Sequence, residues 1–64
     1  MKYVIRISKR NRLFYLHEDG IFLTWMANSA KRFDIYEEAE EVAKCLTSGW
    51  TTAVVVVDYN LPSY

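Results

Sequence analysis

Two side chains in this sequence are of types that can carry out catalysis, and each type occurs once. His17 stands beside Glu18 and Asp19, and an imidazole next to carboxylates is the arrangement of a general base. Cys45 could supply a nucleophilic thiolate. Neither residue has a companion motif, so we interpret His17 as a solvated turn residue and Cys45 as a small buried apolar group. The sequence therefore predicts that the chain is not an enzyme.

The sequence also lacks a pattern that would hold a metal or a cofactor. One histidine and one cysteine, far apart in the chain, match no zinc-binding spacing. The only glycines, Gly20 and Gly49, are each explained by a turn or a helix end and form no phosphate-binding loop. The acidic run of residues 37–41 could hold a cation or mimic phosphates, but acids near a helix N-terminus usually form a solvated face. We predict no metal site and no cofactor.

Basic residues gather in two short polar segments, and this pattern leaves single-stranded nucleic-acid binding as an alternative function. Aromatic side chains on the neighbouring predicted strands could stack on bases. Against this function, the pI is near 6.5, and the acidic helix would repel phosphate unless it lies on the far side of the molecule. The alternative nucleic-acid site comprises Lys9, Arg10, Arg12, Lys31 and Arg32.

Three strands that would position these groups can be predicted in the first part of the chain. Residues 2–8, 13–17 and 21–26 are rich in β-branched and aromatic side chains, which is typical of strands. The second and third strands are joined by Asp19-Gly20, a strong signal for a hairpin turn.

A helix and a last strand follow. Asp34, with Glu37 three residues later, resembles a capping box at a helix start. Gly49 fits the left-handed position after the helix, with Trp50 packing back on the last turn at Cys45 or Leu46. Residues 51–59 are predicted as a strand that ends before Pro62. The residues at helical spacing that should face the sheet are Ile35, Ala39, Val42, Ala43 and Leu46.

The element order predicts an α+β fold, a small β-β-β-α-β domain that spans residues 1–64. One helix would pack on one face of a mostly antiparallel four-stranded sheet. If the helix makes a right-handed crossover, the last strand returns beside the first and parallel to it. The strand order across the sheet would then be third, second, first, last.

The composition fits a globular protein of the cytoplasm. Half of the residues are hydrophobic (52%) and a quarter are charged (25%), which argues against disorder. A lone cysteine excludes an internal disulfide, and residues 1–6 lack the apolar core of a signal peptide or membrane span. Residues 1–32 hold seven bases and two acids, whereas residues 33–64 hold one base and six acids, so two copies could attract each other. We expect the chain to form a homodimer and to make no contact with a membrane.

The distribution of apolar residues over the sheet indicates a binding surface. A single helix covers one face, yet several predicted strands are apolar on both faces. A second copy, the tail of residues 58–64 or a foreign protein could cover the other face. The alternative is a strongly twisted sheet that simply exposes single aromatic side chains. The predicted protein-binding residues, on the face without the helix, are Phe14, Leu16, Phe22, Trp25 and Met26.

Several blocks of the sequence resemble a group of very short proteins encoded by bacteriophages and prophages. The blocks are YVIRI at residues 3–7, Trp25, AKRF at residues 30–33 and EEAEE at residues 37–41, whereas the hairpin segment HEDGIFLTWM departs from the pattern. The resemblance implies a non-catalytic accessory protein of the host cytoplasm. Such a protein would act by stoichiometric binding, for example as an inhibitor of a host or defence protein such as a CRISPR effector.

Overall fold

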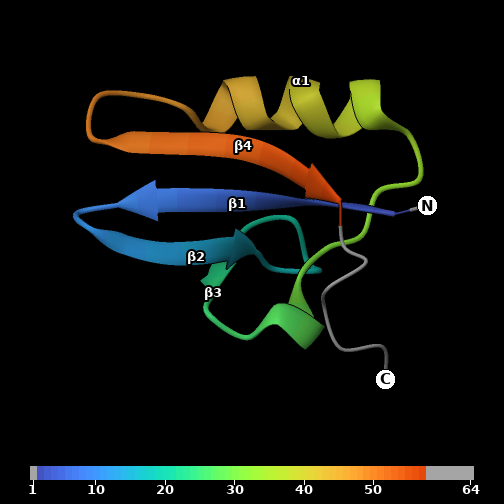
Figure 1. The fold of residues 1–64 in the computed structure, drawn as a ribbon, viewed down its shortest axis with the longest axis horizontal. Coiled ribbons are helices and arrows are strands. Elements are labelled where there is room, and N and C mark those ends of the chain that lie inside the picture. The colour runs from blue at the N-terminus through green and yellow to red at the C-terminus, as the bar shows by residue number, and fades with distance from the viewer. Residues whose placement is uncertain (1, 58–64) are drawn as a thin grey trace.

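The computed structural model describes residues 2–57, apart from the side chain of Ala27. Predicted positions 58–64, including the end of the last strand and the tail, lie outside the described residues. The elements are β1 (Tyr3–Lys9), β2 (Arg12–Leu16), β3 (Leu23–Thr24), the short 3-10 helix η1 (Ala27–Ser29), α1 (Tyr36–Leu46) and β4 (Thr51–Val57) (Figure 1). The predicted α+β class and the β-β-β-α-β order are confirmed.

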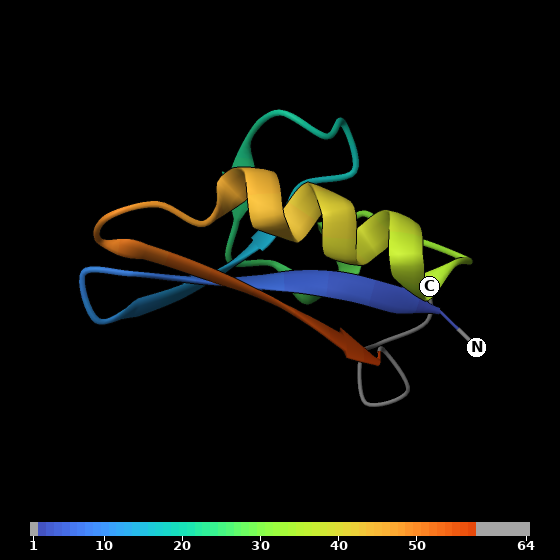
Figure 2. The same cartoon turned by 90° about the horizontal axis from the view of Figure 1, so that it is seen from above.

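The strands form one sheet in the order β3-β2-β1-β4, as predicted, with α1 on one face (Figure 2). The predicted parallel pairing of the last strand with the first is wrong. β4 runs antiparallel to β1 along its whole length, from the pair Tyr3 and Val57 to the pair Lys9 and Thr51. Every strand pair in the sheet is therefore antiparallel.

The connector between β3 and α1 explains the direction of β4. Ala30 forms a bridge with His17 at the end of β2, and Phe33 forms one with Tyr3 at the start of β1. The Phe33 N–H donates to the Tyr3 carbonyl at 2.8 Å, and the Tyr3 N–H donates to the Phe33 carbonyl at 2.9 Å. The connector thus crosses to the end of the sheet where β1 begins, and α1 starts there. α1 therefore runs in the same direction as β1, and the chain enters β4 opposite the end of β1. This is why β4 is antiparallel to β1.

The core lies between α1 and the sheet face that carries alternate residues of β1. Ile5 and Ile7 are 0% and 1% exposed, and the small side chains of Ala39 and Ala43 let α1 approach the sheet closely. The buried cluster comprises Ile5, Ile7, Leu16, Phe33, Ala39 and Ala43. Val42 and Leu46 of the predicted helix stripe pack against this cluster, whereas Ile35 precedes the helix and is exposed.

Both ends of α1 differ from the prediction. The N-cap is Ile35 without a side-chain cap, because Asp34 forms an ion pair with Lys2 instead of capping the helix. The hydrogen bond and the positive charge of Lys2 lower the pKa of Asp34. At the other end Thr47 is the C-cap, and its N–H donates to the Ala43 carbonyl at 3.0 Å.

The turn between α1 and β4 places two residues differently from the prediction. Gly49, with φ of +39°, lies within this turn and not directly after the cap. Ser48 and Thr51 exchange backbone hydrogen bonds, so the turn closes on itself and leaves Trp50 88% exposed. Cys45 is also exposed, because it lies on the side of α1 away from the buried alanines. The predicted packing of Trp50 on the helix and the predicted burial of Cys45 are wrong.

Candidate functional site

The turn of residues 17–22, between β2 and β3, is closed by backbone hydrogen bonds. The His17 N–H donates to the Phe22 carbonyl at 2.8 Å, and the Gly20 N–H donates to the His17 carbonyl at 2.8 Å. Gly20 has φ of +77°, a left-handed conformation that glycine adopts without steric cost. The predicted Asp-Gly turn is therefore where the sequence placed it.

Asp19 organises the inside of this turn. Its Oδ1 accepts the N–H groups of Ile21 at 2.8 Å and Phe22 at 3.1 Å. These two hydrogen bonds, more than the nearby imidazole, lower the pKa of Asp19. The Nδ1 of His17 accepts the Asp19 N–H at 3.2 Å. His17 and Asp19 therefore hold the backbone of the turn, which is a structural role for the residues that resembled a general base.

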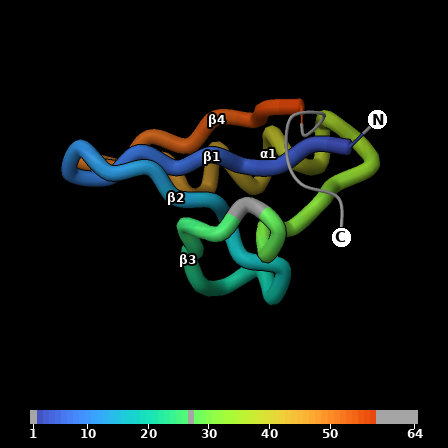
Figure 3. Tube along the Cα trace, turned by 60° about the horizontal axis from the view of Figure 1, so that its bottom comes forward, coloured from blue at the N-terminus to red at the C-terminus, as the bar shows by residue number. Residues whose placement is uncertain are grey.

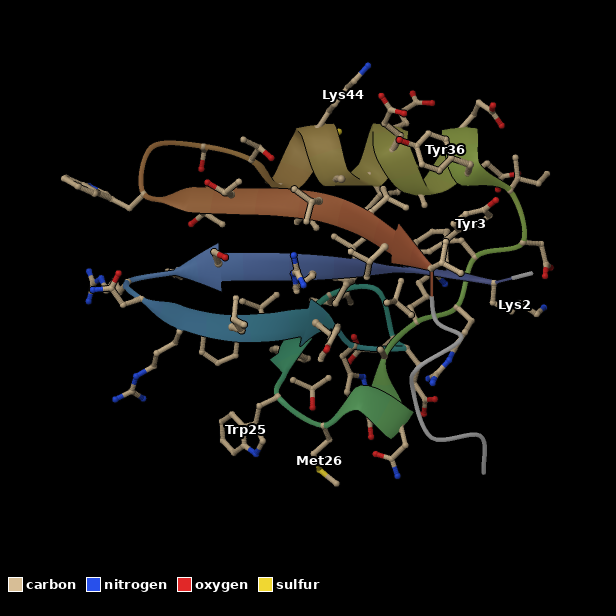
Figure 4. All side chains as sticks on the ribbon, viewed as in Figure 1. Lys2, Tyr3, Trp25, Met26, Tyr36 and Lys44 are labelled. Atoms are coloured by element: carbon tan, nitrogen blue, oxygen red, sulfur yellow. The ribbon has the colours of Figure 1, made fainter. Side chains whose placement is uncertain are left out.

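Five large apolar side chains beside this turn are exposed, and we call them the hairpin patch. The patch and its exposed fractions are Ile21 75%, Phe22 67%, Leu23 38%, Trp25 77% and Met26 53%. Trp25 and Met26 point away from the body of the domain, on the side of the molecule opposite α1 (Figure 4). The turn and β3 form a lobe at the edge of the sheet farthest from β4 (Figure 3).

The patch is exposed because β3 is much shorter than the predicted strand of residues 21–26. Only Leu23 and Thr24 pair with β2. On the N-terminal side of this pair, Asp19 Oδ1 accepts hydrogen bonds from the N–H groups of Ile21 and Phe22. On the other side, the Met26 N–H donates to Thr24 Oγ1 at 3.0 Å, and the chain turns into η1. Local side-chain acceptors thus compete with the strand ladder and end it on both sides.

The predicted protein-binding residues separate into three groups. Phe22, Trp25 and Met26 belong to the hairpin patch. Phe14 is half-buried on the face that carries α1, where it packs against the core, and its ring centroid lies 6.5 Å from that of Trp25. Leu16 is only 1% exposed and is a core residue. The prediction that Phe14 and Leu16 lie on the face without the helix is wrong, because cross-strand register puts Phe14 beside buried Ile7.

The face without the helix is mixed rather than uniformly apolar. Leu13 is 60% and Val54 41% exposed on this face, but exposed Arg6 lies between Val54 and Tyr15 in the register. Serine and threonine occupy the next cross-strand pair, Ser8 with Thr52. The largest group of exposed apolar side chains is therefore the hairpin patch. Ile21 and Leu23 were not predicted as members of this group, although the Asp-Gly turn that precedes them was a usable signal.

The two basic segments lie at opposite ends of β2. Arg12 starts the strand at the tight turn of Arg10 and Asn11, which both have positive φ. The Lys31 N–H instead donates to the carbonyl of Leu16 at the other end of the strand. The Lys31 ammonium lies 5.6 Å from the Phe33 ring centroid, and Arg32 donates to the Ala30 carbonyl at 2.9 Å. The structure does not bring the five predicted basic residues into one site.

A different residue joins the first basic segment. Exposed Trp50, from the turn before β4, lines a cavity of about 610 Å³ together with Arg10 and Arg12. The cavity is completed by Ser8, Asn11, Leu13 and Thr52. The sequence does not predict this cavity, because the cavity depends on β4 running antiparallel to β1, which brings residue 50 to the β1–β2 turn.

Within residues 2–57 no three acidic, histidine or cysteine side chains gather as metal ligands, and no helix is long and apolar enough to cross a membrane. Comparisons with known proteins give no further guide to the site. No protein-family model, curated protein or solved structure matches this chain.

Proposed function

We propose that the chain is a non-catalytic protein-binding module whose hairpin patch docks against a partner protein. The observation that carries the proposal is the exposure of the five apolar residues of the patch, each between 38% and 77% exposed. Exposed apolar surface of this kind is a mark of interaction sites. Tryptophan is also the residue type most enriched among those that dominate binding energy, so Trp25 is the expected anchor.

The turn beneath the patch supports this function because it fixes the geometry of the contact. Asp19 and the closed backbone hydrogen bonds hold Ile21 and Phe22 in one arrangement before any partner arrives. A preorganised surface loses less conformational entropy on binding than a flexible loop does. Phe14 packs against the core and also lies beside Trp25, so this contact holds the patch against the rest of the domain.

The partner we propose is a host or defence protein in the bacterial cytoplasm, bound stoichiometrically by a phage-encoded accessory protein or inhibitor. The similarity of residues 3–7, Trp25, residues 30–33 and residues 37–41 to short phage proteins supports this part of the proposal. The concentration of bases in residues 1–32 and of acids in residues 33–64 supports self-association into a homodimer.

Affinity capture from a bacterial lysate tests the proposal when two tryptophan variants are compared. Trp25→Ala removes the expected anchor from the patch, and Trp50→Ala removes an exposed tryptophan outside the patch. The captured protein, once identified by mass spectrometry and purified, should bind the wild type and Trp50→Ala but lose binding to Trp25→Ala. Circular dichroism should show the same fold for all three.

Phe22→Lys gives a second test of the same surface. Because Phe22 is 67% exposed, a lysine fits there without unfolding the domain, but its charge should abolish docking against an apolar partner surface. Partner capture that is equal for wild type, Trp25→Ala and Phe22→Lys would show that the patch is not the binding surface.

A second candidate function, single-stranded nucleic-acid binding, is favoured by the cavity at the β1–β2 turn. An exposed indole beside two guanidinium groups offers stacking for a base and positive charge for a phosphate, and Trp50, Arg10 and Arg12 supply these groups. Titration of a labelled oligonucleotide at two salt concentrations tests this function. Binding should weaken steeply with salt and be lost in Trp50→Ala but not in Trp25→Ala. Absence of binding at low salt would end this candidate.

A further inference from the structure

The turn that joins β1 to β2 and the turn that joins α1 to β4 lie side by side at one end of the domain (Figure 1). Lys9 and Thr51 form the last register pair of β1 with β4, so Trp50 stands beside the β1–β2 turn. Lys9 is also opposite Arg12 across that turn, and like charges opposite each other in a sheet repel. Among residues 2–57 no ion pair involves Lys9, Arg10 or Arg12. This end of the domain therefore carries positive charge that the described residues do not neutralise.

Arg10 occupies an unfavourable backbone position in the β1–β2 turn. Arg10 and Asn11 have φ of +51° and +65°, the left-handed region that two-residue hairpin turns use. Glycine and asparagine adopt this region most readily, and a long side chain does so rarely. The turn thus accepts strain at the position that brings a guanidinium group to the cavity lined by Trp50. Backbone strain of this kind clusters at functional sites.

The positive charge continues onto the face without the helix. Arg6 is exposed there, stands opposite Tyr15 of β2 and makes no ion pair among residues 2–57. Ser8, between Arg6 and the turn, lines the cavity. The residues of β1, β2 and β4 that share this face are Val4, Arg6, Ser8, Leu13, Tyr15, Thr52, Val54 and Val56. None of these is acidic, so an anion in the cavity can extend along the three strands toward Arg6 without meeting a carboxylate.

The acidic residues among residues 2–57 lie away from this surface. Glu18 and Asp19 follow the far end of β2, and Asp34 pairs with Lys2 at the start of β1. The remaining acids of the described chain are on α1, which covers the opposite face of the sheet (Figure 2). The acidic helix was expected to repel phosphate unless it lies on the far side of the molecule, and that is where it lies. The sheet thus separates these carboxylates from the cationic surface.

Two aromatic side chains mark the two ends of this surface. Val54 is at the level of Tyr15 in the register and follows Trp50 by four residues, which is about 13 Å at the rise of a strand. Two strand spacings, about 10 Å, separate β4 from β2 across the sheet. Trp50 and Tyr15 are therefore too far apart for one nucleotide to contact both, and a strand of several nucleotides is needed.

We propose that single-stranded nucleic acid binds along this face of the sheet, from Trp50 at the turn to Tyr15. The inference rests on the second candidate function proposed above and extends its site from the β1–β2 turn onto the sheet. One base stacks on Trp50 and another on Tyr15. The guanidinium groups of Arg6, Arg10 and Arg12 bind the phosphates between the two bases. An acidic protein segment offers the same charge but no base to stack, so the two aromatic rings favour nucleic acid as the occupant.

Fluorescence anisotropy of labelled oligothymidylates of increasing length, bound to the full chain, tests the proposal. Affinity should rise at least about tenfold from the dinucleotide to the longest strand, because only a long strand reaches both rings. A decaglutamate peptide should not displace the longest strand. Equal affinity for the dinucleotide and the longest strand would overturn the proposed path along the sheet. Displacement by decaglutamate as effective as by unlabelled oligothymidylate would overturn nucleic acid as the occupant.

Arg6→Gln and Lys44→Gln form a matched pair of variants. Each removes one positive charge from an exposed residue, on opposite sides of the sheet, so both should keep the wild-type circular dichroism spectrum. Arg6→Gln should weaken binding of the longest strand and reduce the slope of log affinity against log salt by about 0.7. Lys44→Gln should leave that slope unchanged. Equal slopes for the two variants would overturn the phosphate contact at Arg6.

Tyr15→Leu and Tyr15→Phe test the second stacking position. Tyr15→Leu removes the ring and should lower affinity for the longest strand about fivefold or more, whereas Tyr15→Phe keeps the ring and should bind like wild type. Arg6→Gln decides the question if half-buried Tyr15 does not tolerate leucine. Binding that is lost in Trp50→Ala but unchanged in Tyr15→Leu and Arg6→Gln would overturn this inference and leave the second candidate function standing. Absence of binding to the wild type would overturn both.

Discussion

β1 and the hairpin patch are both rich in large apolar side chains, but the molecule surrounds them differently. β1 has β2 on one side, β4 on the other and α1 above, and its residues Ile5 and Ile7 are at most 1% exposed. The patch follows a turn and includes one short edge strand, and its side chains are 38% to 77% exposed. Burial in this chain is thus decided by how many neighbouring elements an apolar residue has.

The two regions also differ in what holds their backbones. In β1 the ladder to β4 runs along the whole strand, the ladder to β2 covers Arg6 to Lys9, and Phe33 bonds to the backbone of Tyr3. In the hairpin the side chains of Asp19 and Thr24 accept backbone N–H groups in place of a strand. The fold therefore depends on the body formed by β1, β4 and α1, whereas the hairpin leaves its apolar side chains exposed.

The largest expected effect separates two isoleucines, one from each region. Ile5→Ala removes a fully buried side chain and should lower the free energy of unfolding by about 2–5 kcal/mol, because it leaves a cavity in the core. Ile21→Ala changes a side chain that is 75% exposed and should change that free energy by less than about 0.5 kcal/mol. Urea denaturation followed by circular dichroism measures both. Equal effects would contradict the division into body and hairpin.

Overpacking under α1 should give the next largest effect. Ala43 is 4% exposed and packs against the buried cluster, so Ala43→Leu should force α1 away from the sheet. The expected loss of stability is about 1–3 kcal/mol. Glu41→Leu introduces the same side chain at an exposed position of the same helix and serves as the control. Thermal unfolding that shows no difference between the two variants would mean that α1 does not pack closely at Ala43.

The body of the fold could be predicted because its sequence is periodic. Runs of β-branched and aromatic residues identified β1 and β4, and helical spacing identified α1. The direction of β4 could not be predicted, because it depends on the irregular connector that bridges Tyr3 to Phe33. A segment without periodicity carries no signal for a long-range bridge of this kind.

The candidate site could be predicted only in part, because periodicity tells which residues share a face but not what covers that face. Phe14 and Leu16 were correctly assigned to one face, yet that face is the one that α1 covers. Trp25 and Met26 were predicted to lie in a strand and to bind a partner; they are exposed, but they follow β3, which ends at Thr24. The competition between strand ladder and local acceptors could not be weighed from residue types alone.

Removing the carboxylate of Asp19 should disorder the hairpin and leave the body unchanged. Asp19→Ala deletes the acceptor of the Ile21 and Phe22 N–H groups, so these two amide protons should exchange faster while those of β1 do not. Asp19→Asn keeps an oxygen acceptor and should lie between Asp19→Ala and wild type. Faster exchange in β1 as well would show that the hairpin and the body unfold as one unit.

Acid should have the same local effect on the wild type. The pKa of folded Asp19 is lowered from 3.8, so its contribution is fully present above pH 3.8 and is lost as the pH falls through the lowered value. The amide chemical shifts of Ile21 and Phe22 should therefore move in acid below pH 3.8. The same shifts in Asp19→Asn should stay constant over that range, and a parallel movement in this variant would exclude Asp19 as the titrating group.

The smallest expected effect concerns the exposed side of α1. Here, as in the hairpin, side chains interact at the surface of the domain. Glu40→Gln removes the pair with Lys44 and should cost about 0.3–0.5 kcal/mol of stability. Glu40 also raises the pKa of Tyr36 above 10.0, so the folded chain holds this proton more tightly, and the resulting stability is lost as the pH rises through the raised value. In Glu40→Gln the Tyr36 ring resonances should titrate closer to pH 10.0. A Tyr36 titration that Glu40→Gln leaves unchanged would mean that this carboxylate does not contact the phenol.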